Sequence, residues 1–105
     1  MSTRPIARLM IAPRLSLTLY VAGDNVYSRI AQANLKSILA EMDLHVRFST
    51  VDVLRHPELT MQKRIFVTPA LIVSTDAGVE SLIVGDFSNR EKVTGMFRNL
   101  GSVSG

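Results

Sequence analysis

Two histidines and a few carboxylates near predicted strand ends are the residues of this chain whose types could do chemistry. His45 begins a predicted strand, and His56 precedes a proline in a predicted loop. Asp52 and Asp86 each come at the end of an apolar run. An imidazole beside a carboxylate can act as a general acid or base, and the same groups can bind Zn²⁺.

No spacing in the sequence completes such a site. Neither histidine has a cysteine nearby, and no pair of carboxylates converges on it. Carboxylates at strand ends commonly accept hydrogen bonds within turns, which is the role we expect for Asp52 and Asp86. The sequence therefore predicts no catalytic residue, no bound metal and no cofactor.

The composition disfavours several other kinds of function. The chain has no cysteine, which excludes thiol catalysis, disulfides and thiolate metal sites. Its net charge of +3 comes from scattered Lys and Arg, and it has no Trp, so a basic face with interleaved aromatics for nucleic acid is not expected. Prolines interrupt the basic start of the chain and no long apolar run follows, so we expect no signal peptide, no membrane span and a cytoplasmic location.

The length of the chain predicts one domain. With 105 residues, 47% of them hydrophobic, it can form a single core. Residues 1–14 lack a regular apolar period and residues 101–105 are small, so we expect a flexible extension and a flexible tail around one domain at 15–100. A domain of this size leaves roughly a third of its unfolded surface exposed, which favours a function on the surface.

Apolar periodicity predicts seven elements. They are a strand at 15–21, a helix at about 25–43 capped by Asp24 or Asn25, a strand at 44–53, a short helix from Pro57 to about Phe66, strands at 68–74 and 79–85 joined by a turn at 76–78, and a helix opened by Ser88. The order is β-α-β-α-β-β-α. This order is that of the thioredoxin-like α/β fold, a four-stranded sheet with helices on its faces.

The thioredoxin-like order raises the question of redox chemistry. A thioredoxin dithiol would lie between the first strand and the first helix, where this chain reads "AGDNVYS", so disulfide exchange has no nucleophile. In this fold the Thr-Pro peptide before the third strand is commonly cis, and Thr68 and Pro69 occupy that place. A relic of glutathione binding is the minor alternative that this position leaves open.

Four stretches together resemble the KaiB family of bacterial circadian-clock proteins: "LTLYVAG", "VDVLRHPEL", "VTPAL" and "VGDFSNREKV". They less closely resemble the KaiB-like sensory domain of a clock-associated histidine kinase. The resemblance covers about residues 15–100. It implies a protein without catalytic activity that binds the ATPase ring of KaiC and sequesters KaiA or displaces a kinase.

The resemblance also implies two folds for one sequence. One is a monomeric thioredoxin-like state that binds KaiC, and the other is a dimeric or tetrameric β-α-β-β-α-α-β state. The segment "GDFSNREKV" would then be a hinge, in which Gly85 permits unusual backbone angles while Ser88 and Glu91 form a capping box worth about 1 kcal/mol. We count Pro69, Asp86, Met96 and Arg98 among the hinge residues. By pattern alone, the segment is an ordinary strand-to-helix turn.

The last helix departs from the pattern of the family. Met96 stands where the family commonly has glycine, which has moved to Gly95, and Arg98 replaces the usual aspartate. Near a helix C-terminus, that arginine would favour the helix by about 0.3–1 kcal/mol through the macrodipole. We therefore expect the thioredoxin-like state to be well populated.

Three basic residues are the candidate partner contacts. Arg55 and Arg64 stand at positions that are basic in the family, and Lys63 is adjacent, although each could be only a solvated surface charge. Other positions where the family has basic residues are occupied by Thr18, Ile30, Ser81 and Leu82. These losses leave an alternative open: a paralogue held in the thioredoxin-like state that serves another signalling or stress-response partner.

Overall fold

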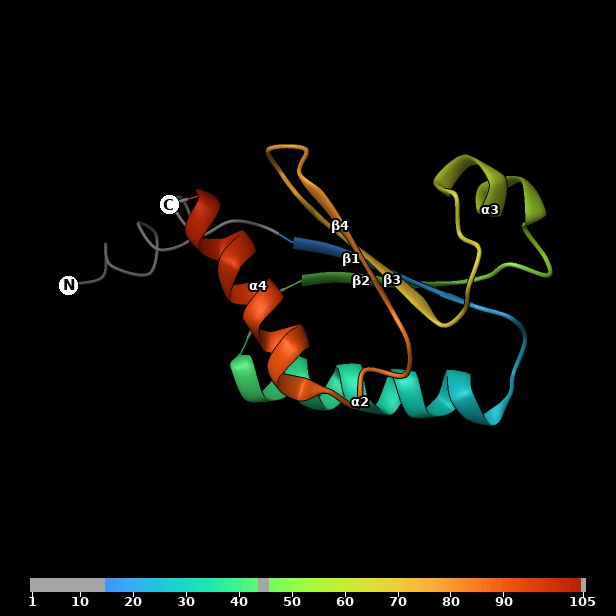
Figure 1. Ribbon diagram of the computed structural model, residues 1–105, viewed down its shortest axis with the longest axis horizontal. Helices are drawn as coiled ribbons and strands as arrows, with labels where there is room; N and C mark the ends of the chain where they lie inside the picture. Colours follow the sequence, from blue (N-terminus) through green and yellow to red (C-terminus); the bar gives the residue numbers. More distant parts are fainter. Residues whose placement is uncertain (1–14, 44–45, 105) are drawn as a thin grey trace.

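The computed structural model describes residues 15–43 and 46–104, and the side chains of all of these except 101–104. Its elements are β1 (Leu15–Val21), α2 (Val26–Met42), β2 (Val46–Asp52), α3 (Pro57–Lys63), β3 (Ala70–Thr75), β4 (Glu80–Val84) and α4 (Arg90–Ser104) (Figure 1). The predicted order β-α-β-α-β-β-α is confirmed. His45 and the predicted extension at 1–14 lie outside the described residues.

The four strands form one sheet in the order β2-β1-β3-β4. β1 pairs in parallel with β2, so that Leu15 lies opposite Val46, and in antiparallel fashion with β3, so that Leu15 also lies opposite Thr75. β3 and β4 form the expected hairpin. The fold is therefore thioredoxin-like, and the alternative order β-α-β-β-α-α-β is not the fold seen here.

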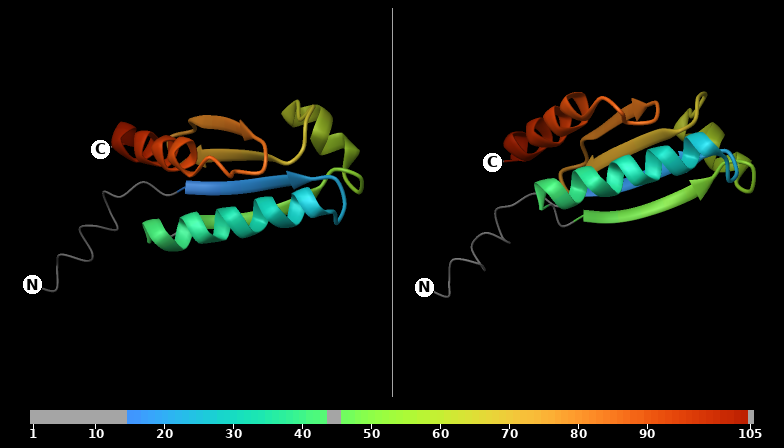
Figure 2. Two further views of the ribbon diagram at one scale, coloured as in Figure 1. Left: turned by 60° about the horizontal axis from the view of Figure 1, so that its bottom comes forward. Right: turned by 90° about the horizontal axis from the view of Figure 1, so that it is seen from below.

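The main core lies between one face of the sheet and the helices α2 and α4, which both cover that face (Figure 2). Alternation along β1 turns Leu17 and Leu19 into this core, and Leu71 of β3 lies there too. The helices contribute side chains at 3.6-residue spacing. These are Ala31, Leu35 and Ile38 of α2 and Val93, Phe97 and Leu100 of α4.

The second face of the sheet is only partly covered. Tyr20, Ala70 and Ile72 form a smaller cluster on it with Ile65, which follows α3. α3 itself lies at one end of the molecule (Figure 1). Leu82 of β4 belongs to the same face and stays half exposed.

The observed helix ends confirm one detail of the sequence prediction and correct another. Asn25 caps α2, because its Oδ1 accepts a hydrogen bond from the Ser28 amide at 3.0 Å. α3 ends earlier than expected, since Arg64 turns the chain into the left-handed region with φ of 55°. Phe66 is therefore not part of this helix, and it points away from the core.

The expected capping box of Ser88 and Glu91 is wrong, because the N-cap of the last helix lies one residue later, at Asn89. α4 begins at Arg90, and the Oδ1 of Asn89 accepts a hydrogen bond from the Lys92 amide at 3.2 Å. Ser88 instead donates its amide to Asp86 Oδ1 at 3.0 Å, which fixes it in the turn before the helix. Asparagine is as good an N-cap as serine, so the helix starts where the turn ends.

The macrodipole argument for Arg98 does not apply to this conformation. α4 continues to Ser104, and its last turn contains no basic residue. The effect of the macrodipole falls off within a single turn, and Arg98 lies farther from the end than that. Glu91, by contrast, lies in the first turn, where a negative charge is favourable.

Candidate protein-interaction surface

The loops after β1 and β2 meet beside α3, and Asp52 holds them together. Its Oδ1 accepts hydrogen bonds from the amides of Gly23 and Leu54, both at 3.0 Å. The expectation that this carboxylate accepts turn hydrogen bonds is confirmed. Gly23 has φ of 72°, a backbone conformation that glycine adopts without strain.

The three candidate basic residues lie at the two ends of α3. Arg55 precedes the helix and lies 3.9 Å from Asp52 Oδ2, with most of its side chain exposed. Lys63 Nζ at the other end lies 3.6 Å from Glu80 Oε2, which links α3 to β4. Arg64 is exposed, and no ion pair joins it to a carboxylate of the described chain. Exposed ion pairs of this kind contribute little to stability, so these charges can be rearranged for a partner.

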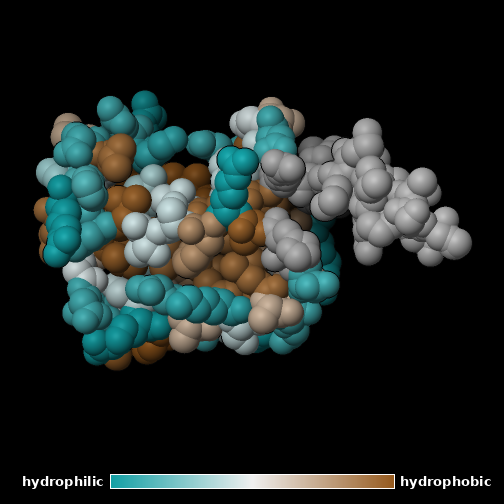
Figure 3. Space-filling view, turned by 180° about the vertical axis from the view of Figure 1, so that it is seen from behind, coloured by the Kyte–Doolittle hydropathy of each residue, from teal (hydrophilic) through white to brown (hydrophobic). Residues whose placement is uncertain are grey.

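Large apolar side chains accompany these charges. The exposed fractions are 71% for Leu54, 80% for Met61, 88% for Phe66 and 58% for Val67. At the end of the molecule that carries α3, hydrophobic side chains come to the surface among hydrophilic ones (Figure 3). We call these four residues, with the three basic ones, the α3 surface. A cluster of exposed apolar side chains with a polar rim is typical of a protein-interaction site.

Sequence reasoning missed the apolar part of the α3 surface. Periodicity shows which residues share a face, but not whether another element covers that face. The signal that could have found it is the pair Phe66 and Val67, two apolar residues placed between a helix end and a buried strand. The start of α2 extends the same kind of surface through Tyr27, which is also exposed.

The predicted hinge residues are brought together in part. The amide of Gly85 donates to the carbonyl of Pro69 at 2.9 Å, and the Thr68–Pro69 peptide is cis. Gly85 has φ of 117°, which glycine tolerates. Met96 is partly buried against the main core on α4, away from the turn. The predicted hinge residues therefore fall into two groups, one at the turn before α4 and one on α4 itself.

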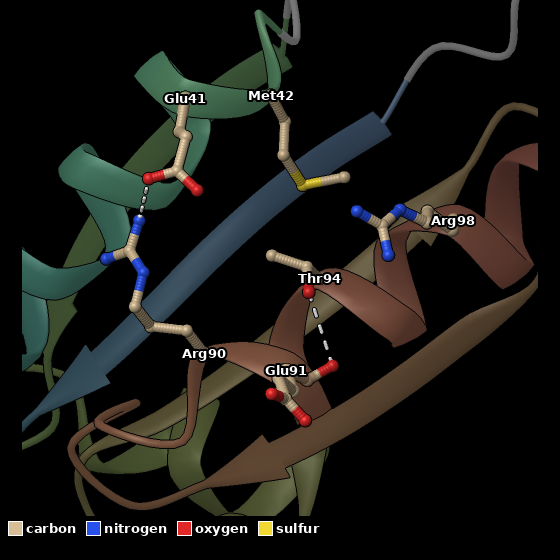
Figure 4. Close-up of a pocket in the computed structure, with 6 residues that line it drawn as sticks. All are labelled: Glu41, Met42, Arg90, Glu91, Thr94 and Arg98. Carbon is tan, nitrogen blue, oxygen red and sulfur yellow. Dashed lines mark hydrogen bonds and ion pairs between the residues drawn. The ribbon is translucent and has the colours of Figure 1, made fainter.

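Arg98 lines an open depression between the end of α2 and the start of α4. This depression measures about 530 Å³, and its lining residues are Glu41, Met42, Arg90, Glu91, Thr94 and Arg98 (Figure 4). Arg90 Nη2 contacts Glu41 Oε2 at 2.6 Å. Two glutamates and two arginines leave the depression without net charge, so it does not favour an ionic ligand.

The pKa of Asp86 is lowered below its ordinary value of 3.8 by hydrogen bonds from Ser88. The hydroxyl of Ser88 has the larger effect and its amide the smaller one. These donors stabilise the ionised carboxylate. Because the pKa is lower in the folded state, the Asp86 contribution to stability is present above pH 3.8. It is lost as the pH falls through the folded-state pKa.

Replacement Ser88→Ala is expected to raise the pKa of Asp86 toward its ordinary value, because it removes the hydroxyl that stabilises the carboxylate most. An NMR titration of the Asp86 carboxyl carbon measures the shift. Thr94→Ala is the control, since that hydroxyl bonds the carbonyl of Glu91 instead. An Asp86 pKa that stays unchanged in Ser88→Ala would contradict the assignment.

The remaining side chains with catalytic or metal-binding potential are dispersed. His56 Nδ1 lies 3.7 Å from Glu58 Oε1, and both side chains are largely exposed. Over residues 15–43 and 46–104, no three His, Asp or Glu side chains are grouped so that they could hold a metal ion. In the same part of the chain, no helix combines the length and the apolar character that crossing a membrane requires.

Comparison with known sequences gives a consistent result. The family model for the KaiB domain matches residues 18–99. The circadian clock protein KaiB3 of Synechocystis is 39% identical over 82 residues, which cover 76% of this chain and 78% of that protein. The circadian clock oscillator protein KaiB of Synechococcus elongatus is 40% identical over 78 residues, covering 73% of this chain and 76% of that protein.

Solved structures resemble this fold as well. The N-terminal domain of SasA from Synechococcus elongatus matches with a TM-score of 0.66 and 25% identity, covering 81% of each chain. Deadhead, a thioredoxin of the fruit fly Drosophila melanogaster, matches with a TM-score of 0.67 at 16% identity over 95% of this chain and 93% of its own. The second likeness concerns the fold alone, since the cysteines of a thioredoxin site have no counterpart in a chain without cysteine.

Proposed function

The chain belongs to the KaiB family, and from this we propose that it is a non-enzymatic, cytoplasmic protein-interaction module that binds a KaiC-like ATPase ring. The observation that carries the proposal is the KaiB match across residues 18–99. Binding would regulate the phosphorylation cycle of the ATPase. The exposed apolar and basic side chains beside α3 supply a surface suited to such a partner.

The α3 surface is the proposed contact. Phe66 and Met61 are large apolar side chains that lose their contact with water on binding, which is the main source of affinity in protein interfaces. Arg55 and Arg64 lie beside them and can pair with carboxylates of the partner. The partner surface should therefore be apolar at its centre and acidic at its rim.

The function is proposed to include a change of fold. In the thioredoxin-like state described here, Gly85 and Phe87 both have positive φ and lead into α4. Reassignment of the chain after β2 would give the oligomeric state, in which the α3 surface is no longer formed. The ATPase would then shift the population toward the thioredoxin-like state. The shift is set by how much more tightly the ATPase binds that state than the oligomeric one.

Further clock proteins are proposed as competitors or additional partners. The N-terminal domain of SasA shares the fold at 25% identity. Two modules of one fold can present the same surface, so a sensor kinase with such a domain would compete with this chain for the ring. KaiA is the other proposed partner.

The binding proposal is tested with a purified KaiC homologue loaded with ATP. A complex on size-exclusion chromatography is expected, and a thioredoxin of the same fold should give none. The protein should first be shown to be folded by its NMR spectrum. Absence of a complex with folded protein would contradict the proposal and favour the paralogue with another partner.

A further inference from the structure

One face of α2 carries three polar side chains that meet the turn before α4 and the first residue of α4. Asn34, Ser37 and Glu41 are spaced by three and four residues, so they lie along one stripe of the helix. This stripe borders the core positions Leu35 and Ile38. We call the three residues the α2 stripe.

The α2 stripe holds both ends of the turn between β4 and α4. Asn34 Nδ2 donates to the carbonyl oxygen of Asp86 at 2.8 Å. Arg90, the first residue of α4, donates to Ser37 Oγ at 3.3 Å. It also donates to Glu41 Oε2 at 2.6 Å (Figure 4). The partners are 49 to 53 positions apart in the chain. These bonds therefore exist only while α4 lies against α2.

The turn that is held in this way has a strained backbone. Phe87 has φ of 62°, a conformation that side chains with a Cβ rarely adopt. Its side chain is 4% exposed and belongs to the main core. Strained residues of this kind persist only where the surroundings fix them. The bonds of the α2 stripe on either side of Phe87 are part of what fixes it.

We propose that the α2 stripe is a latch that determines how often α4 and its turn detach from α2. When the three hydrogen bonds break, the strain at Phe87 is released together with them, so opening is cooperative. The latch rests on the proposed function only in one respect: a chain that changes fold must open this contact first. Its strength would therefore limit the rate at which the thioredoxin-like state is left.

The latch is tested by amide hydrogen exchange on the isolated full chain, with no partner present. Asn34→Ala removes the bond to Asp86, and Glu41→Ala removes the acceptor of the bond from Arg90. Each is expected to speed exchange at Val93 and Phe97 by about two- to tenfold, the effect of losing one hydrogen bond. Lys36→Ala, on the exposed side of the same helix, is the matched control and should change nothing.

A charge exchange separates the latch from a general loss of stability. The double variant Glu41→Arg with Arg90→Glu should restore slow exchange at Val93 that either single change has lost. Exchange at Leu17 and Val73 in the central strands should stay as in the parent protein. Unchanged exchange in α4, or equal acceleration in the strands, would overturn the latch. The result stands apart from KaiC binding, which is measured on a different sample.

Discussion

Replacement Phe66→Ala is expected to weaken binding to a KaiC-like ATPase by roughly 10- to 100-fold, the effect of removing an aromatic anchor at the centre of an interface. Phe66 is 88% exposed, so the isolated chain gains little from its side chain. A partner that covers it would gain the apolar area that water now surrounds. Titration calorimetry with the ATP-loaded ring measures the change in affinity.

The same side chain should contribute little to the fold. The free energy of unfolding of Phe66→Ala is expected to stay within about 0.5 kcal/mol of the parent chain. Lys92→Ala is the control for binding, because Lys92 is also an exposed residue but lies on α4, at the other end of the molecule from α3 (Figure 1). Equal losses in the two variants, or full affinity in Phe66→Ala, would count against the α3 surface.

Replacement Phe97→Ala is expected to lower the free energy of unfolding of the thioredoxin-like state by about 3–5 kcal/mol, from the lost transfer energy and the cavity left behind. Phe97 is 2% exposed and packs in the main core from α4. Domains of this kind have a total stability of about 5–15 kcal/mol, so the change is a large part of the whole. Urea unfolding followed by circular dichroism measures it.

A surface change on the sheet gives the matched comparison for Phe97. Leu82→Ala alters a half-exposed side chain on the open face, and a loss of less than about 1 kcal/mol is expected. NMR shifts of residues 88–99 should show in addition whether Phe97→Ala leaves α4 helical. A loss for Phe97→Ala no greater than that for Leu82→Ala would mean that α4 is not part of the cooperative fold.

The elements of the fold could be predicted because their sequence periods are clear. Leu15, Leu17 and Leu19 alternate along β1, and Leu35 and Ile38 follow the helical period. The ends of elements were harder, since neighbouring residues compete for the same role. Asn89 caps α4 in place of Ser88, because the bond to Asp86 holds Ser88 in the turn that precedes the helix.

Of the α3 surface, only the three basic residues could be predicted from the sequence. Arg55, Lys63 and Arg64 came from the resemblance to the family, and the structure places them at the ends of α3. The exposure of Phe66 depends on where α3 ends, which a left-handed Arg64 decides, and no pattern in the sequence specifies that angle. The contact between Glu41 and Arg90 joins positions 49 residues apart and needs the tertiary arrangement.

The position of β1 inside the sheet has a consequence for protein synthesis. β1, α2 and β2 are complete once residue 52 has left the ribosome, and the two strands make up the parallel pair of the sheet. The other edge of β1 stays unpaired until β3, residues 70–75, has been translated. An unpaired edge accepts whichever strand reaches it first. The nascent chain therefore carries an open docking edge for some 20 residues of translation, as counted between β2 and β3.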